Sequence, residues 1–323
     1  MTYTYNDICI TPESISTISS RSECNPYVEG NTLPIFTAPM STIVDENNYK
    51  VFKENGIIPI IPRSVDAEIR KQLMLTGEWV AVSLKEFEEW FIKIGYLFGI
   101  QLNICIDIAN GHMQSLLDAI KYAKTKHDHL TVMTGNIANP NTLENYNKIV
   151  DFARLGIGAG NGCITSSNTG IHYPMASLVH RARNIQYIFE INTQIIADGG
   201  IRNYSDVIKA LALGANYVMI GSLFAKCEEA CGDTIEINGE RYHHFYGMAS
   251  KEGQIDLQGA KCKTAEGISK NIKIEYTLKQ WVQNMTDYLK SAMSYCNTRN
   301  LKEFIGNQCY EIMSPNAQLA INK

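Results

Sequence analysis

Cys163 ends a glycine-rich run, GIGAGNGC, and is followed closely by the hydroxyl residues Thr165, Ser166 and Ser167. Glycine backbone allows a ligand to approach closely and leaves a neighbouring thiol loosely packed. A thiol surrounded by backbone amides and hydroxyls can act as a thiolate nucleophile. A single cysteine is more often a structural residue, so this segment alone leaves both interpretations open.

Two glycine turns predict a phosphate site. Gly199-Gly200 ends the run TQIIADGG, and Gly221-Ser222 ends the run NYVMIGS. Turns of this kind bring backbone N–H groups to an anion beside the positive ends of helix dipoles. The glycines also fit a purely structural role in tight turns, but two such pairs in successive units favour phosphate.

Further polar residues follow other apolar runs. Asp107 and Asn110 end the run that starts at Asn103, and Asn136 ends the run that starts at Leu130. The histidines show no metal-binding spacing such as HExxH. A nucleophile with phosphate and amide ligands is therefore a better prediction than a metal centre.

The elements that must position these residues repeat along the chain. Eight apolar runs of strand length occur at 33–40, 56–62, 79–84, 103–109, 130–138, 152–160, 193–200 and 216–222. Each suits a parallel strand buried on both faces. Eight strand-helix units in succession predict an α/β fold of the (β/α)8 TIM-barrel type, whose active sites lie where the strands end. A doubly wound sheet would usually have fewer strands and a phosphate loop after the first.

Helical patterns separate these runs, at 64–77, 86–99, 111–127 and 203–215. Leu116, Leu117, Ile120 and Ala123 form one apolar stripe of the third. In the fourth, Ser205 is the expected N-terminal cap and Gly214 the expected C-terminal glycine.

A long segment after the eighth run breaks this rhythm before the helical pattern at 279–296. Asn238-Gly239 predicts a hairpin between two β-like stretches. The remainder is a glycine- and lysine-containing loop. Long loops in compact domains are often functional lids, and a lid here lies on the catalytic face of a barrel.

The composition excludes several classes of protein. The chain has 323 residues, of which 45% are hydrophobic and 19% charged, with a net charge of −4 and no basic run. These values fit one globular domain over residues 1–323 and argue against a nucleic-acid polymer or a membrane as partner. Nine scattered cysteines without CxxC pairs, and no signal-peptide pattern, lead us to expect a reduced, cytoplasmic protein.

Several motifs, taken in order, resemble the IMP dehydrogenase/GMP reductase family. They are YNDICITP, SRS at Ser20–Ser22, PIFTAPMSTI, ICIDIANGH, TGNI, GIGAGNGCITSSNTGIHYP, IIADGGI, ANYVMIGSLFA, FYGMAS and AEG. The match runs from about Tyr5 to about Phe304, and ICIDIANGH and TGNI are closer to the reductase branch. The resemblance implies a barrel without a regulatory insert, acting on a purine nucleotide with NADPH.

The resemblance also assigns roles to individual residues. Cys163 corresponds to the nucleophile that attacks purine C2, and Thr165 and Glu266 correspond to the residues that assist the departure of ammonia. Met248 borders the base, and Glu266 also contacts its edge. The implied substrate-binding set is Asn161, Asp198, Gly199, Gly200, Gly221, Ser222, Tyr246, Gly247, Met248 and Gly267. The implied cofactor-binding set is Ser83, Asp107, Ala109, Gly111, Asn136 and Lys263. A monovalent cation such as K⁺ would bind at Gly158 and Gly160, and a homotetramer is implied.

The implied reaction is the reductive deamination of GMP to IMP and ammonia through a covalent cysteine thioimidate. IMP dehydrogenase activity or reduction of a related purine nucleotide stays open as an alternative. A flavin-binding barrel or a catalytically silent nucleotide-binding relative is a third. Between Met248 and Glu266 the chain lacks the arginine-tyrosine pair of dehydrogenase flaps, which favours the reductase.

Four departures from the family pattern bear on the ligands. Asn161 stands where the family usually has serine, Ser166 where an arginine is common, and Lys263 where an arginine often lies. The loop after VAVS is short, LKEFEEW. The choice between NADPH and NADH, and between GMP and a deoxy or otherwise altered nucleotide, therefore stays open.

Overall fold

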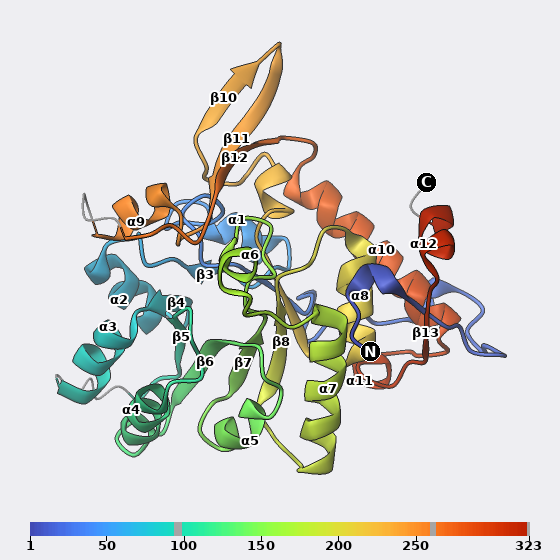
Figure 1. The fold of residues 1–323 in the computed structure, drawn as a ribbon, viewed down its shortest axis with the longest axis horizontal. Helices are drawn as coiled ribbons and strands as arrows, with labels where there is room; N and C mark the ends of the chain where they lie inside the picture. Colours follow the sequence, from blue (N-terminus) through green and yellow to red (C-terminus); the bar gives the residue numbers. More distant parts are fainter. Residues whose placement is uncertain (94–98, 259–262, 322–323) are drawn as a thin grey trace.

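The chain folds into a barrel of eight parallel strands (Figure 1). The computed structural model describes residues 1–93, 99–258 and 263–321. The barrel strands are β2 (Ile35–Thr37), β3 (Ile60–Ile61), β4 (Trp79–Val82), β5 (Leu102–Asp107), β6 (Leu130–Ile137), β7 (Phe152–Leu155), β8 (Gln194–Asp198) and β9 (Tyr217–Ile220). Each of the eight predicted runs contains one strand, so the predicted TIM-barrel fold is confirmed.

The sheet closes on itself between its first and second strands. Its order is β2-β9-β8-β7-β6-β5-β4-β3. A parallel bridge joins Phe36 to Ile58, where the Thr37 amide donates to the Ile58 carbonyl at 3.0 Å. Because no strand is left with a fully open edge, the carboxyl ends of all eight strands meet at one rim.

The inside of the barrel is a separate apolar cluster. Every second residue of a strand points inward, and the inward set is Phe36, Ile60, Ala81, Cys105, Met133, Ile196 and Met219. The aromatic side chains of Phe36, Trp79 and Phe152 pack edge to face against one another. The barrel is thus filled by side chains, and only its rim is left for a ligand.

Helices cover the outside of the barrel. They are α1 (Tyr49–Glu54), α2 (Ala67–Leu75), α3 (Leu84–Glu88), α4 (Gln114–Lys124), α5 (Thr142–Tyr146), α6 (Thr165–Thr169), α7 (Met175–Ile188), α8 (Tyr204–Leu213) and α10 (Leu278–Tyr295), with α11 (Leu301–Phe304) and α12 (Pro315–Ile321) near the C-terminus. Short 3-10 turns lie at Tyr5–Asp7, Arg21–Glu23 and Phe224–Lys226. The 14-residue helix α7, between the sixth and seventh barrel strands, was not predicted from the sequence.

Helix boundaries differ from the sequence predictions at two places. The N-terminal cap of α8 is Asn203, whose Oδ1 accepts the Asp206 amide at 3.0 Å, so the prediction of Ser205 was wrong. Ser205 already lies inside the first turn, whereas Asn203 has the extended backbone of a cap. Gly214 ends the helix with φ of +116°, as predicted. The helix predicted over 86–99 is α3 followed by a π-turn (Glu89–Lys93), and its remainder, 94–98, lies outside the described residues.

The excursion after β9 forms a three-stranded antiparallel sheet that projects from the barrel (Figure 1). Its strands are β10 (Thr234–Ile237), β11 (Glu240–Tyr246) and β12 (Ser269–Lys273). Asn238 and Gly239, with φ of 54° and 79°, form the two-residue turn that the sequence predicts. Between β11 and β12 the chain returns to the rim through α9 (Lys251–Gln258).

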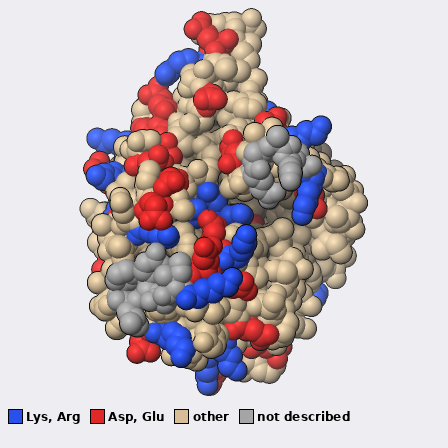
Figure 2. Space-filling model, turned by 90° about the vertical axis from the view of Figure 1, so that its left-hand side faces the viewer, with Lys and Arg blue, Asp and Glu red and all other residues tan. Residues whose placement is uncertain are grey.

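The two ends of the chain lie beside the outer helices. β1 (Ile8–Ile10) pairs antiparallel with β13 (Tyr310–Ile312), so the N-terminal and C-terminal segments meet next to α8 (Figure 1). On the face drawn in Figure 2, acidic and basic side chains are interspersed. Within the described ranges, every helix is too short or too polar to cross a membrane.

Candidate active site

A cavity of about 220 Å³ lies at the rim of the barrel, where the carboxyl ends of the strands meet. Its walls come from the segment after β2, the ends of β5 and β7, the glycine-rich loop after β7, the turns after β8 and β9, and the excursion. The predicted site residues among its walls are Asp107, Gly160, Asn161, Cys163, Asp198, Gly199, Gly200, Gly221, Ser222, Gly247, Met248, Glu266 and Gly267. Segments far apart in the sequence therefore build one site.

Cys163 is half-buried in this cavity. Its Sγ lies 3.3 Å from Thr165 Oγ1, within hydrogen-bond distance. Cys24, Cys105, Cys227 and Cys296, in contrast, are buried. Burial raises the pKa of Cys105 to about 12, which keeps that thiol protonated and unreactive. The geometry thus separates Cys163 from the core cysteines.

Thr165 connects the thiol to a carboxylate on the excursion. The Thr165 hydroxyl donates to Glu266 Oε2 at 2.6 Å. Sγ, Oγ1 and Oε2 form a continuous chain that can carry a proton between the cavity and the carboxylate. We call Cys163, Thr165 and Glu266 the relay.

Backbone hydrogen bonds fix the two halves of the relay against each other. An antiparallel bridge pairs Cys163 with Gly267. The Ile164 amide donates to the Glu266 carbonyl at 2.9 Å, and the Ile268 amide donates to the Gly162 carbonyl at 2.9 Å. The relay geometry is therefore set by main-chain pairing between residues about a hundred positions apart.

A buried arginine joins two of the predicted carboxylates. Arg154 Nη1 lies 2.7 Å from Asp107 Oδ1, and its Nη2 lies 2.9 Å from Asp198 Oδ2. Asn136 Nδ2 also donates to Asp198 Oδ2, at 2.7 Å. Burial by itself lowers the pKa of the Arg154 guanidinium, but the charges of Asp198 and Asp107 outweigh it and raise that pKa above its ordinary value. Arg154 is thus a permanent cation at the bottom of the cavity.

Four of the predicted phosphate ligands, Asn161, Gly200, Gly221 and Ser222, line the cavity. Asn161 Nδ2 lies 3.4 Å from Ser222 Oγ, so the loop after β7 meets the turn after β9. The Gly200 amide donates to the Ala159 carbonyl at 2.9 Å. Tyr246 lies at the end of β11, outside the cavity wall, and its hydroxyl donates to Asp256 Oδ2 of α9 at 2.6 Å. Burial and this hydrogen bond raise the pKa of Tyr246 to about 12.

A second cavity of about 530 Å³ adjoins the first. The two share Asp107, Met248, Ala249 and Glu266 as walls. Its apolar walls are Ile108, Ala109 and Leu257, and its polar walls include Arg63, Asn136, Gln254 and Lys263. Its apolar and cationic lining suits a ligand that has an apolar part and anionic groups, and its shared wall with the first cavity includes Glu266 of the relay. Of the predicted cofactor residues, Asp107, Ala109, Asn136 and Lys263 line this second cavity.

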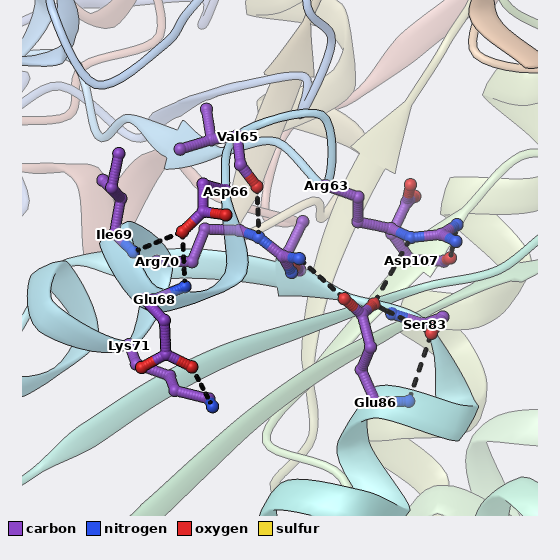
Figure 3. A network of polar contacts seen from close by, with 11 residues as sticks. Arg63, Val65, Asp66, Glu68, Ile69, Arg70, Lys71, Ser83, Glu86 and Asp107 are labelled. Carbon is purple, nitrogen blue, oxygen red and sulfur yellow. Dashed lines mark hydrogen bonds and ion pairs between the residues drawn. The ribbon is translucent and has the colours of Figure 1, made fainter. Parts of the chain in front are cut away.

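Arg63 enters the second cavity from a charged network that the sequence analysis missed (Figure 3). Glu86 Oε1 pairs with the buried Arg70 at 2.6 Å, while Glu86 Oε2 lies 3.8 Å from Arg63 Nε. Within the described part of the chain, Arg63 Nε is buried without a hydrogen-bond partner. The carboxylate of Glu86 compensates its charge as an ion pair rather than as a hydrogen bond.

Two predicted cofactor residues have other contacts. Ser83 caps α3, since its Oγ accepts the Glu86 amide at 3.2 Å and donates to Glu86 Oε2 at 2.8 Å. Gly111 is packed against Tyr146, and a Cβ at Gly111 would lie 2.7 Å from the Tyr146 hydroxyl. Neither residue lines the two cavities.

The predicted cation ligands lie in the loop after β7. The Gly158 carbonyl accepts the Ser166 hydroxyl at 3.0 Å, and the Gly160 carbonyl accepts the Cys163 amide at 3.0 Å. No group of three or more His, Cys, Asp or Glu side chains among the described residues has metal-binding geometry. A cation at this loop would thus depend on backbone carbonyls.

Sequence reasoning missed Arg154 although its signal was present. It is the charged residue in the otherwise apolar run FARLGIGAG. A charge inside a buried strand is rare unless it is paired, so its position predicts buried acidic partners. Arg63 lies between β3 and α2, and the only sequence signal for a functional role is its place at the end of a strand.

Comparisons with known proteins agree with the geometry. A family model described as "IMP dehydrogenase / GMP reductase domain" matches residues 78–320. The GMP reductase of Staphylococcus aureus strain Newman is 33% identical over 315 residues, which cover 93% of each chain. The GMP reductases of strains bovine RF122 / ET3-1 and JH9 are also 33% identical, with the same coverage.

Proposed function

Because the chain belongs to the IMP dehydrogenase/GMP reductase family, we propose that it is an NADPH-dependent GMP reductase. The reaction is GMP + NADPH + 2 H⁺ → IMP + NH₄⁺ + NADP⁺. The observation that carries the proposal is the relay, a thiol in the rim cavity joined through Thr165 to Glu266 by contacts of 3.3 and 2.6 Å. The relatives' activity as GMP reductases, given by their names, supports the same reaction.

In this proposal, Cys163 is the nucleophile. The sulfur attacks purine C2, and the exocyclic amine must be protonated before it leaves as ammonia. Glu266 supplies the proton through the Thr165 hydroxyl. Loss of ammonia leaves a thioimidate between Cys163 and C2, and the carbon–sulfur bond breaks after C2 has been reduced.

The nucleotide would lie with its phosphate toward Asn161, Gly200, Gly221, Ser222 and Tyr246, and its base toward Met248, Gly247 and Gly267. Gly199 and Asp198 would contact the ribose-phosphate. The placement of most of these residues around one cavity supports this orientation.

NADPH fits the second cavity. Arg63 and Lys263 offer positive charge for its phosphates, while Ile108, Ala109 and Met248 offer an apolar surface for the nicotinamide. Bound there, NADPH supplies the hydride that reduces C2, and Asp107 lies between the two ligands.

The most direct test follows NADPH absorbance with GMP and, in parallel, NADH formation from NAD⁺ with IMP. Consumption of NADPH that depends on GMP and releases ammonia supports the reductase. Turnover only of IMP with NAD⁺ would assign the protein to the dehydrogenase reaction. A yellow purified protein would indicate a flavin, and GMP binding without any turnover would indicate a silent relative.

The resemblance supports further proposals. We infer a homotetramer, a single catalytic domain, and a monovalent cation held by the carbonyls of Gly158 and Gly160. Sedimentation analysis and the dependence of turnover on K⁺ against Na⁺ test the assembly and the cation.

A further inference from the structure

Arg154 is the most deeply buried charged group at the rim. The residue is 6% exposed, and a guanidinium in such a place is stable only when it is fully paired. Its planar guanidinium contacts a different carboxylate on each of two sides. Nη1 meets Asp107 Oδ1 at 2.7 Å, whereas Nε and Nη2 meet Asp198 Oδ2 at 3.0 and 2.9 Å.

The contacts of Asp198 are concentrated on one oxygen. Oδ2 receives both Arg154 nitrogens and Asn136 Nδ2. Among the residues that the structure describes, none donates to Oδ1. The side chain of Asp198 lines the cavity and is 15% exposed. Its Oδ1 is therefore the oxygen left to accept hydrogen bonds from a ligand.

Asp107 receives the other side of the guanidinium. It lies in the wall of both cavities, while Asp198 lies only in the wall of the first. The Arg154 guanidinium thus fixes Asp198 in the wall of the first cavity and Asp107 in the wall that the two cavities share. Backbone packing supports this arrangement, since a Cβ at Gly135 on the neighbouring strand would lie 2.7 Å from Arg154 Cβ.

We propose that Arg154 is a positioning residue that turns Asp198 Oδ1 toward the ribose hydroxyls of the nucleotide and so makes the enzyme select ribonucleotides over 2′-deoxyribonucleotides. The inference rests on the proposed function, which supplies both the purine nucleotide in the first cavity and the contact of Asp198 with its ribose. Both ribose hydroxyls are donors, and a carboxylate oxygen held in place accepts from them. A nucleotide without the 2′-hydroxyl leaves part of that acceptor capacity unused in a partly buried site, which costs binding free energy.

Arginine and lysine differ in this role. A guanidinium offers separate N–H groups in a rigid plane, so it binds Asp107 and Asp198 together. An ammonium is a point charge on a flexible stem, so it satisfies one carboxylate at a time. Arg154→Lys therefore keeps the charge and loses the orientation.

The experiment measures kcat/KM for GMP and for 2′-deoxy-GMP in the wild type and in Arg154→Lys. We expect the wild type to prefer GMP, and this preference to fall by about tenfold in the variant. An equal loss of activity with both nucleotides, and an unchanged preference, would overturn the inference. Arg70→Lys is the matched control, because Arg70 is 3% exposed and paired with Glu86. It should lower thermal stability without changing the preference.

A double-mutant cycle tests whether Arg154 acts through Asp198. In an Asp198→Asn background, Arg154→Lys should change the preference no further. An undiminished change in that background contradicts the inference. Asn136→Ala removes another donor to Oδ2 and should lower the preference in the same direction. Asn136→Ala therefore tests the inference by itself if Arg154→Lys does not fold.

Equilibrium binding separates this inference from the proposed function. Calorimetry with GMP and 2′-deoxy-GMP gives the binding preference whether or not the protein turns over. A wild type that binds both nucleotides equally overturns the inference and leaves reductase activity standing. A protein that binds with the expected preference but never oxidises NADPH refutes the proposed reaction and keeps the role of Arg154.

Discussion

The rim of the barrel and the excursion after β9 hold their polar residues by different means. On the rim, Arg154 is buried and binds two carboxylates, and Asp198 receives three donors on one oxygen. On the excursion, Asp256 of α9 is exposed and accepts single hydrogen bonds from Ser41 and Tyr246, at 2.9 and 2.6 Å. Exposed contacts contribute little to stability.

This difference indicates a division of tasks. The rim supplies fixed groups, because strands and buried charge pairs leave their side chains few alternatives. The excursion also supplies groups held only by single, exposed hydrogen bonds, as at Asp256. The relay crosses between the regions, since Cys163 and Thr165 belong to the rim and Glu266 belongs to the excursion.

The largest effect should come from the rim half of the relay. Cys163→Ala should lower kcat with GMP and NADPH by at least about 1000-fold, because no other described group in the cavity replaces the sulfur as nucleophile. GMP binding, measured by calorimetry, should remain close to that of the wild type. Substantial turnover by this variant would exclude covalent catalysis at Cys163.

The excursion half of the relay should have the next largest effect. Glu266→Gln keeps the shape of the side chain but removes the carboxylate, so it should slow deamination of GMP by about 100-fold or more. A single turnover of NADP⁺ with IMP, which stops at the thioimidate and transfers no ammonia, should be slowed much less. A fully active Glu266→Gln enzyme would contradict the proton path through Thr165.

Loosening α9 should have a smaller effect. Asp256→Ala removes the acceptor for Ser41 and Tyr246, so Gln254 and Leu257 on the same helix should lose their fixed place beside the second cavity. We expect the KM for NADPH to rise by about threefold. Tyr246→Phe is the matched variant, because it removes the hydroxyl that donates to Asp256. It should also raise the KM for NADPH, and if Tyr246 binds phosphate as well, the KM of this variant for GMP rises too. A rise in the KM for GMP alone in Asp256→Ala would refute the role of α9 at the cofactor.

The smallest expected effect is a pH dependence of folding stability, caused by His112 in the segment after β5. Burial lowers the pKa of His112, whose ordinary value is 6.5, and its Nε2 accepts the Ala138 amide at 3.2 Å. The unfolded chain therefore binds more protons than the folded one, so stability falls as the pH drops through and below the ordinary value.

Urea unfolding at about pH 7.5 and about pH 5.5 measures this loss of stability. His112→Gln keeps an acceptor but does not titrate, and it should reduce the difference between the two midpoints. An unchanged difference would show that other groups cause the acid sensitivity.

Sequence patterns predicted which residues lie at the rim far better than which of them contact one another. All eight strands were predicted because apolar runs of strand length repeat, and most predicted ligands line one of the two cavities. The pattern did not show that Asp107 and Asp198 share Arg154, because that contact depends on how side chains of β5, β7 and β8 point inside the barrel. It also did not show that Ser83 caps α3, since serine suits both a cap and a ligand.

The excursion was harder to predict. The hairpin followed from Asn238-Gly239, whose backbone preference is local. The contact of Asp256 with Tyr246 depends on how α9 returns to the rim, and a single exposed carboxylate gives no sequence signal. The N-terminal cap of α8 was misplaced by two residues because Asn203 and Ser205 have similar capping preferences.

The main-chain pairing of Cys163 with Gly267 has a consequence for variation in length. Glu266 keeps its place beside Cys163 through the main-chain hydrogen bonds between residues 162–164 and 266–268. This pairing does not depend on the number of residues between α9 and Lys263. Relatives or engineered versions should therefore keep the relay when residues are inserted or deleted between Gln258 and Lys263. One added residue between Cys163 and Thr165, or between Glu266 and Ile268, should disconnect proton delivery while leaving the barrel folded.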